Sequence, residues 1–200
     1  MKEPTNIAFA KFISGTNAVK FGNFTLKSGK KSNIFFNFGE ICLGRELIQL
    51  GNFFADFIIE NSLDKVDVLF GPAYKGINIS LATSIGLYQK YNISIPFAYN
   101  RKVRKTHAEG GQFVGYDLTK ASNVLVLDDV ITDGGTKYEA IDMLSSFPNL
   151  KIKAIIVGVD REEKDSTGKL CRIKFIEDTG IDILALTTKS EVLKFEWSSG

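Results

Sequence analysis

The segment Val124–Thr136, VLVLDDVITDGGT, constrains the fold of this chain more than any other. Its first four residues are apolar, as in a buried strand of a parallel sheet, and they run directly into Asp128 and Asp129. The glycines that follow let backbone N–H groups close around an anion, and a helix expected from Lys137 onward would point its positive end at that anion. Ligands of open α/β sheets bind at the carboxyl ends of the strands, where both carboxylates would lie. A phosphate cradle beside two hydroxyl acceptors suits a phosphorylated sugar.

A simpler interpretation of this segment is a strand that ends in a helix cap. Asp128 and Asp129 would then be solvated turn residues, and the glycines would only form the turn. For a generic apolar-Asp-Asp-Gly segment the two interpretations carry similar weight. The full pattern, hydrophobic-DD-V-I-T-x-G-G-T, is much more specific.

Length and composition narrow the class of protein. A chain of 200 residues is long enough for one well-buried α/β domain with a small appendage. The formal charge of +2 gives no case for nucleic-acid binding, and no apolar run reaches membrane-spanning length. Cys42 and Cys171 are far apart in the sequence, which favours reduced thiols in a cytoplasmic protein over a disulfide. We expect no nucleic acid, membrane or zinc ion as a partner.

Hydrophobic patterning predicts strands that alternate with helices along one domain of residues 1–200. Helices are expected over residues 4–15, 44–60, 76–90 and 136–147, with a short one near the C-terminus. Strands are expected twice within residues 19–38, and then at 66–70, 94–99, 123–127, 151–159 and 183–187. This alternation indicates an α/β fold with a mostly parallel sheet and helices on both faces.

A second candidate ligand loop is Leu69–Gly76, LFGPAYKG, which follows a strand and precedes a helix. The spacing of Gly71 and Gly76 superficially resembles a P-loop, but a P-loop needs lysine where Ile77 stands. The residue order therefore excludes that kind of ATPase. Lys75 could still meet a pyrophosphate as a point charge, and the alternative is a solvated lysine in a turn.

The stretch Asn100–Gly115, NRKVRKTHAEGGQFVG, gathers four cations and the only histidine of the chain. Like charges repel one another and attract water, so a mobile loop is expected rather than a packed element. A solvated charge run or a small nucleic-acid patch would have the same composition. The near-neutral charge of the whole chain favours a cationic lid that closes over pyrophosphate and excludes water.

The stretch Phe24–Phe38, FTLKSGKKSNIFFNF, places Lys27 among turn-forming residues and Phe35 and Phe36 in a strand-like pattern. Paired aromatic residues in strands more often fill a core than line a ligand site. This stretch nevertheless has a second interpretation when the other motifs are considered with it.

Together these motifs resemble a known family. The pattern around Asp128 and Asp129 resembles the phosphoribosyl pyrophosphate (PRPP) signature of the type I phosphoribosyltransferases. With FTLKSGKKS, FFNFG, LFGPAYKG, NRKVRKTHAEGG and VDREE at 159–163, the resemblance covers nearly the whole chain and is to the orotate phosphoribosyltransferases. It implies the type I phosphoribosyltransferase fold, with a small N-terminal hood contributed mainly by residues 1–40.

The resemblance also implies roles in PRPP binding and catalysis. Asp128 and Asp129 would be catalytic and contact the ribose 2- and 3-hydroxyls. The 5-phosphate would be held by the loop of Thr132, Asp133, Gly134, Gly135 and Thr136. Other contacts to PRPP or pyrophosphate would come from Lys27, Tyr74 and Lys75. The lid would contain Arg101, Lys102 and the catalytic candidates Lys105 and His107, and would reach the neighbouring subunit's site in a homodimer with shared active sites.

On the base side, Phe35 and Phe36 would line the orotate pocket. Thr132 and Arg161 would bind orotate, with the guanidinium suited to its carboxylate. Three departures from the family pattern stand out: Asp133 where many members carry a small residue or threonine, Ser32-Asn33-Ile34 where proline and an aromatic are usual, and Lys30 where arginine is common. A carboxylate at 133 would repel the phosphate unless its side chain points away from it.

The implied reaction transfers the 5-phosphoribosyl group from PRPP to orotate, giving orotidine 5-monophosphate and pyrophosphate in pyrimidine (UMP) biosynthesis. It would need positively charged groups that neutralise the leaving pyrophosphate, and it would need Mg²⁺. The ion would be held mainly by PRPP and water near Asp128 and Asp129, with no direct protein ligand. Lys105 or His107 would supply a proton to pyrophosphate. No Cys or Ser nucleophile is required.

Three alternatives stay open from the sequence. A phosphoribosyltransferase for another base shares the signature, although Lys27, the Phe pair and Arg161 argue against a purine base. A non-catalytic PRPP-sensing regulator would normally need a nucleic-acid-binding surface or a further domain. A generic sugar-phosphate α/β enzyme would leave the cationic lid and the hood unexplained.

Overall fold

The computed structural model describes residues 3–25, 31–103 and 111–195. The described helices are α1 (Thr5–Ser14), α2 (Gly44–Glu60), α3 (Lys75–Tyr91), α4 (Gly135–Leu144), α5 (Cys171–Thr179) and α6 (Lys189–Val192), with short 3-10 turns at η1 (Phe38–Glu40) and η2 (Leu118–Lys120). The strands are β1 (Val19–Thr25), β2 (Lys31–Phe36), β3 (Val68–Gly71), β4 (Phe97–Asn100), β5 (Phe113–Gly115), β6 (Asn123–Ile131), β7 (Lys151–Asp160) and β8 (Ile183–Thr188).

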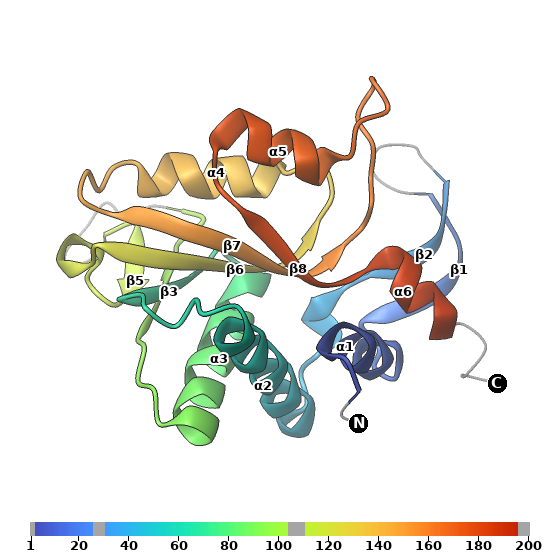
Figure 1. The fold of residues 1–200 in the computed structure, drawn as a ribbon, viewed down its shortest axis with the longest axis horizontal. Coiled ribbons are helices and arrows are strands. Elements are labelled where there is room, and N and C mark those ends of the chain that lie inside the picture. Colours follow the sequence, from blue (N-terminus) through green and yellow to red (C-terminus); the bar gives the residue numbers. More distant parts are fainter. Residues whose placement is uncertain (1–2, 26–30, 104–110, 196–200) are drawn as a thin grey trace.

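Six strands form the central sheet in the order β5-β4-β3-β6-β7-β8, and only β5 is antiparallel to its neighbour (Figure 1). The register aligns one row of residues across five strands: Ala98, Phe70, Val126, Ile155 and Ile183. All five are fully buried on one face of the sheet. The predicted mostly parallel sheet is confirmed.

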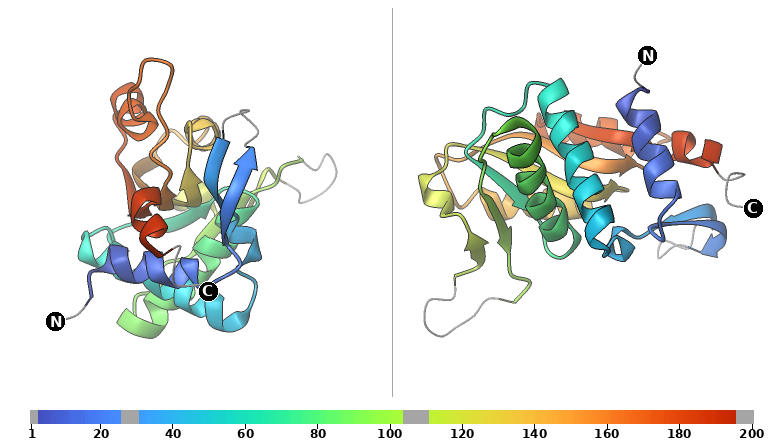
Figure 2. Two further views of the ribbon diagram at one scale, coloured as in Figure 1. Left: turned by 90° about the vertical axis from the view of Figure 1, so that its right-hand side faces the viewer. Right: turned by 90° about the horizontal axis from the view of Figure 1, so that it is seen from below.

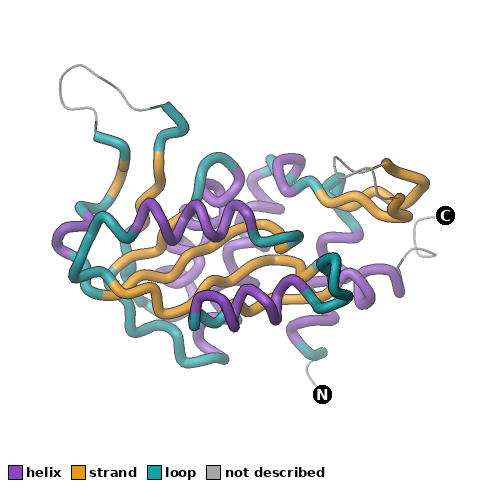
Figure 3. Tube along the Cα trace, turned by 90° about the horizontal axis from the view of Figure 1, so that it is seen from above, coloured by secondary structure: helices purple, strands orange, loops and turns teal. Residues whose placement is uncertain are grey.

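Helices cover both faces of this sheet, as the alternating pattern predicted. The helices α1, α2 and α3 lie side by side across one face, where Phe9, Phe54 and Ile58 fill the core (Figure 2). The helices α4 and α5 cover the other face, with Leu144 and Phe175 in its core (Figure 3). Two buried faces explain why the central strands are nearly continuous apolar runs.

The antiparallel hairpin of β1 and β2 lies beyond the carboxyl ends of β6 and β7, where a hood would stand (Figure 1). Its root is fixed to the sheet by Phe38, whose ring packs against Gly158 of β7. A Cβ atom at Gly158 would come within 2.6 Å of that ring and 2.9 Å of the Asp129 carbonyl oxygen. Gly158 therefore permits the close approach of hood and sheet.

Strand β5 and helix α5 were not predicted, nor were the two short 3-10 turns. The stretch 100–115 was expected to be a loop throughout, but Asn100 ends β4 and residues 113–115 form β5 against it. An edge strand of three residues is too short to show the alternation of apolar and polar residues that predicts a strand. Helix α5 was missed because only Cys171 and Phe175 of its residues are buried, which leaves no clear apolar stripe. Among the described residues, no helix has the length and apolarity needed to cross a membrane.

Candidate active site

A cavity of about 690 Å³ opens at the carboxyl ends of β3, β4 and β6. Its size is that of a small-molecule site. The walls include eight residues that the sequence singled out: Tyr74, Lys75, Arg101, Lys102, Asp128, Asp129, Thr132 and Thr136. Three loops that are far apart in the sequence therefore meet at one sheet edge, where open α/β sheets bind their ligands.

The two aspartates at the end of β6 are buried, each with 6% of its surface exposed. Asp128 Oδ1 accepts the Asp129 N–H at 2.9 Å, and Asp129 Oδ1 accepts the Val130 N–H at 2.8 Å. Burial raises the pKa of Asp128, while the Lys137 ammonium beside it acts in the opposite direction. The interpretation of this pair as solvated turn residues is therefore wrong.

Each aspartate is paired with its own lysine. The Lys75 Nζ lies 2.6 Å from Asp129 Oδ2, and the Lys137 Nζ lies 2.6 Å from Asp128 Oδ2. The sequence had singled out Lys75 but not Lys137. A lysine in the first turn of a helix is disfavoured by the helix dipole, so no pattern in the sequence indicated that this one is buried against a carboxylate.

The loop that carries Lys75 is held tightly against the sheet. A Cβ atom at Gly71 would lie 2.0 Å from the Gly76 carbonyl oxygen, so no larger residue fits without moving the backbone. The Ala73 N–H donates to Asn100 Oδ1 at 2.8 Å, which ties the loop to the end of β4. Lys75 is therefore presented to the cavity from a rigid support.

The loop from Thr132 to Thr136 leads from β6 into α4. Gly134 has φ +88°, a conformation that favours glycine. Asp133 does not point away from this loop, as a neighbouring phosphate would require: its Oδ1 accepts the Gly135 N–H at 3.0 Å and the Thr132 hydroxyl at 3.3 Å. The bond from Gly135 lowers the pKa of Asp133. The Asp133 carboxylate thus binds a backbone N–H group that the prediction assigned to the phosphate.

Arg161 follows β7 beside the same loop, because its N–H donates to the Ile131 carbonyl at 3.2 Å. Only 11% of its side chain is exposed, and its Nη2 donates to Glu163 Oε1 at 3.2 Å. Its Nε is buried and has no hydrogen-bond partner among the residues that the structure describes. Buried polar groups are normally paired, so this donor is suited to an acceptor on a ligand.

In the hood, the two phenylalanines of β2 point to opposite sides. Phe36 is buried in the hydrophobic core, whereas Phe35 is exposed and its ring lies 5.7 Å from that of Phe24. Phe35 is therefore the one of the two that is accessible to a ligand. Lys27 lies outside the described residues.

The two ends of the predicted lid, at residues 101–103 and 111–112, are among the described residues, and they are hydrogen-bonded to each other. The Arg101 N–H donates to the Gln112 carbonyl at 2.7 Å, and its Nη1 donates to the Gly111 carbonyl at 2.8 Å. Arg101 and Lys102 line the cavity. Lys105 and His107 lie outside the described residues.

Cys42 and Cys171 are not joined in a disulfide; Cys42 is exposed and Cys171 is buried. Within residues 3–25, 31–103 and 111–195, no cluster of three or more His, Cys, Asp or Glu side chains is arranged to hold a metal ion. The two buried carboxylates are thus not part of a larger acidic cage among these residues.

The fold and this site define a class of protein. Residues 39–183 match the family model of the phosphoribosyl transferase domain, so the match begins just after the hairpin of β1 and β2. The chain is 42% identical to the orotate phosphoribosyltransferase of Ruthia magnifica over 188 residues, covering 94% of this chain and 86% of that one. It is 37% identical to the Bifidobacterium longum (strain DJO10A) enzyme of the same name over 198 residues, covering 96% of this chain and 86% of the relative.

A solved structure agrees with these relatives. The crystal structure of orotate phosphoribosyltransferase from Francisella tularensis superposes with a TM-score of 0.79 at 39% identity, covering 94% of this chain and 89% of that one. The chain belongs to the orotate phosphoribosyltransferase family. The resemblance in the sequence and the predicted fold are confirmed.

Proposed function

We propose that the cavity at the carboxyl edge of the sheet binds PRPP and orotate, and that the reaction of the family takes place there. The 5-phosphoribosyl group passes to orotate, giving orotidine 5-monophosphate and pyrophosphate in pyrimidine biosynthesis. The observation that carries this assignment is the buried pair Asp128 and Asp129 beside the loop of Thr132 to Thr136 in one cavity. Acceptors for ribose hydroxyls and donors for a phosphate are thereby adjacent.

The sugar end of PRPP is assigned to this pair and this loop. The carboxylates of Asp128 and Asp129 accept the ribose 2- and 3-hydroxyls. The 5-phosphate is held by the backbone N–H groups of the loop Thr132–Thr136 at the positive end of α4. The Asp133 carboxylate turns aside when the phosphate takes the Gly135 N–H.

The pyrophosphate end is assigned to the cations around the cavity. Lys75 has 41% of its side chain exposed and is positioned to exchange Asp129 for a pyrophosphate oxygen. Arg101 and Lys102 approach from the end of β4. Tyr74 lines the same wall, and Lys105 and His107 would complete this cationic surface from the lid.

The base is assigned to the region between Arg161 and the hood. The unpartnered Nε of Arg161 is suited to the orotate carboxylate, and a charged donor and acceptor make one of the stronger hydrogen bonds in proteins. The Thr132 hydroxyl and the exposed ring of Phe35 face the base, while Phe36 supports the hood from the core. Lys27 would reach the site from the hairpin turn.

The chemistry breaks the bond between the anomeric carbon and a pyrophosphate oxygen, which leaves with the electron pair, and forms a bond to a ring nitrogen of orotate. The proton that this nitrogen loses balances the one that pyrophosphate takes up. Positive charge develops on the ribose, next to the Asp128 and Asp129 carboxylates, and negative charge develops on the leaving oxygen, next to Lys75 and Arg101. Groups fixed where charge develops stabilise the transition state without reorganising. Holding both substrates in line lowers the barrier further.

Mg²⁺ is proposed as the cofactor, and the donor set fits an ion that PRPP and water hold. Asp128 and Asp129 each already accept from a lysine, and no third acidic, histidine or cysteine ligand joins them among the described residues. When bound with PRPP, the ion would neutralise pyrophosphate charge. The two aspartates would lie near it without forming its cage.

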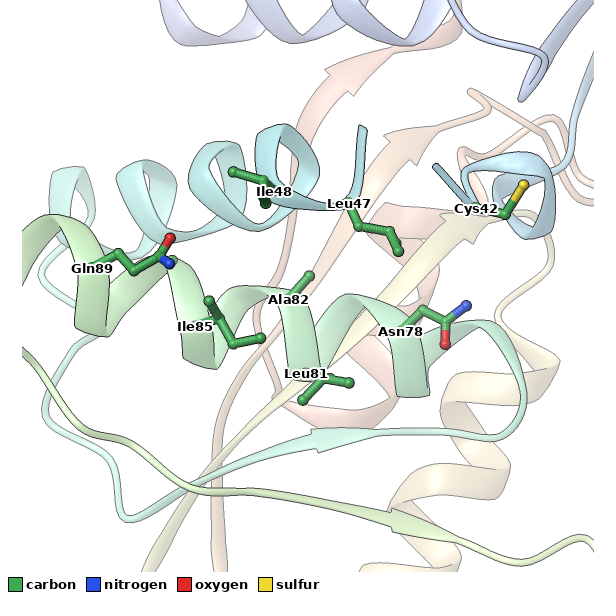
Figure 4. Close-up of a pocket in the computed structure, with 9 residues that line it drawn as sticks. Cys42, Leu47, Ile48, Asn78, Leu81, Ala82, Ile85 and Gln89 are labelled. Carbon is green, nitrogen blue, oxygen red and sulfur yellow. The ribbon is translucent and has the colours of Figure 1, made fainter. Parts of the chain in front are cut away.

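We also propose that two copies of the chain form a dimer through the outer face of α2 and α3. A groove of about 240 Å³ runs between these helices, lined by Ile48 on α2 and by Leu81 and Ile85 on α3 (Figure 4). Leu81, Ile85 and Tyr88 are exposed and form one apolar stripe, a feature typical of protein interfaces. Because α3 begins at Lys75 in the cavity, a partner on this stripe lies next to the active site.

A spectrophotometric assay tests the proposed function. Orotate absorbance should fall in the presence of PRPP and Mg²⁺, whereas adenine, hypoxanthine and uracil should react slowly or not at all. Fast turnover of another base would favour a phosphoribosyltransferase of different specificity. PRPP binding without turnover of any base would favour a regulator that senses PRPP. The reaction is proposed to take place in the cytoplasm, where cysteine thiols are normally kept reduced.

A further inference from the structure

Lys137 is a buried cation inside the proposed PRPP site. It stands in the first turn of α4, directly after the phosphate loop, and only 3% of its surface is exposed. Lysine is almost never fully buried unless its charge is paired. A positive charge at the N-terminus of a helix is also opposed by the helix dipole. Two unfavourable effects therefore have to be offset by the contacts of this side chain.

Those contacts use all three hydrogen-bond donors of the ammonium group. Lys137 Nζ donates to Asp128 Oδ2 at 2.6 Å, to Thr136 Oγ1 at 3.0 Å and to the Val130 carbonyl oxygen. Asp128 belongs to β6, and Thr136 belongs to the loop that is assigned to the 5-phosphate. One buried atom thus connects the ribose-binding acid to the phosphate loop.

The second lysine of the site is held differently. Among the described residues Lys75 donates to one acceptor, Asp129, and 41% of its side chain is exposed, compared with 4% for Lys137. Lys75 can therefore move toward a ligand. Lys137 cannot, because its side chain is buried and all three of its N–H donors are already bound. The two lysines therefore have different tasks, although each is paired with one of the adjacent aspartates.

We infer that Lys137 is a positioning residue for PRPP. By holding Asp128, the end of β6 and Thr136 together, it fixes the distance between the ribose hydroxyl acceptor and the 5-phosphate cradle before the substrate arrives. It also keeps the buried carboxylate paired, so that Asp128 remains an acceptor. Preorganised groups bind without the cost of ordering them at the moment of binding. This inference rests on the proposed role of Asp128 in ribose binding.

Lys137→Met tests it, since methionine keeps much of the volume and removes the charge and the donors. Lys169→Met is the matched control, because it removes an exposed lysine from an ion pair with Glu177, and neither residue lines the cavity. KM for PRPP and KM for orotate are measured separately, with PRPP affinity from equilibrium titration and folding from circular dichroism. Lys137→Met should raise the PRPP KM by about tenfold or more, as expected for the loss of hydrogen bonds to a charged group. The orotate KM should stay nearly unchanged, and the control should match the wild type.

A double-mutant cycle with Asp128→Asn separates positioning from a general loss of stability. If Lys137 acts through Asp128, adding Lys137→Met to Asp128→Asn should reduce PRPP affinity little further. If Lys137→Met alone does not fold, Asp128→Asn can still be compared with the double variant. In the double variant the neutral asparagine replaces the carboxylate that Lys137→Met leaves unpaired. An unchanged PRPP KM in Lys137→Met, equal losses for both substrates, or fully additive effects would overturn the inference. An Asp128→Asn variant with normal PRPP affinity would instead overturn the proposed role of Asp128.

Discussion

Replacing Arg161 with alanine should weaken orotate binding far more than PRPP binding. The guanidinium is nearly enclosed, and its Nε has no hydrogen-bond partner in the described parts of the chain. An orotate carboxylate would supply that partner in a site from which water is largely excluded. Alanine would leave the carboxylate buried without its cation, while the contacts assigned to PRPP lie on other loops.

The size of the effect follows from burial. Removing one partner of a buried, hydrogen-bonded charge pair costs about 2–5 kcal/mol, and about 1.4 kcal/mol corresponds to a tenfold change in affinity. Because Nη2 already donates to Glu163, only part of the guanidinium is available to orotate, which favours the lower end of this range. We therefore expect the orotate dissociation constant to rise by about 30-fold or more.

Steady-state kinetics with each substrate varied in turn checks this prediction, and the PRPP KM serves as the internal control. Uracil, which lacks the carboxylate, provides a second comparison, because its slow reaction should not depend on Arg161. Arg161→Lys should give an intermediate loss, since a lysine keeps the charge but not the planar fork of donors. Equal losses for orotate and PRPP, or for orotate and uracil, would refute the reasoning.

Three further predictions concern the phosphate loop and the dimer. Asp133→Ala should tighten PRPP binding in an equilibrium titration, since no carboxylate would then compete for a loop N–H; weaker binding would contradict the assignment of the loop. Ile85→Glu should shift the protein toward monomer in analytical ultracentrifugation, because it places a charge in the apolar groove, and an unchanged dimer would place the interface elsewhere. Mixing a Lys105→Ala protein with an Asp128→Asn, Asp129→Asn protein should restore up to about half the wild-type activity per heterodimer, by two-fold symmetry; no recovery after confirmed subunit exchange would place the lid over its own subunit's site.

The part of the fold that the sequence predicted well is the part with the strongest patterns. The helix expected over residues 44–60 matches α2, and the apolar run before Asp128 lies in the central strand β6. A strand of this kind is buried on both faces of the sheet, so nearly all of its residues must be apolar, and such a run is easily recognised in a sequence. The short edge strand β5 bears no such pattern, because it is defined by pairing with β4 rather than by burial.

The candidate site was predictable where residue order alone determines position. A carboxylate pair after a parallel strand must lie at the carboxyl edge of the sheet, as Asp128 and Asp129 do. Lys137 could not be assigned in this way, because only the packing of α4 against β6 shows that its long side chain turns inward. The contact of Asp133 with its own loop is likewise a side-chain conformation, which a sequence pattern does not specify.

The central claim is that the two carboxylates at the end of β6 hold the ribose of PRPP. The most direct measurement is PRPP binding and turnover in Asp128→Asn combined with Asp129→Asn, which keeps the shape and removes both charges. Asp117→Asn, at an exposed aspartate that caps η2, is the control. The account predicts that the double variant remains folded by circular dichroism, no longer binds PRPP measurably, and loses about 100-fold or more of its turnover. Near-normal binding and turnover in the double variant would contradict the account and leave the two aspartates with only a structural role at the end of β6.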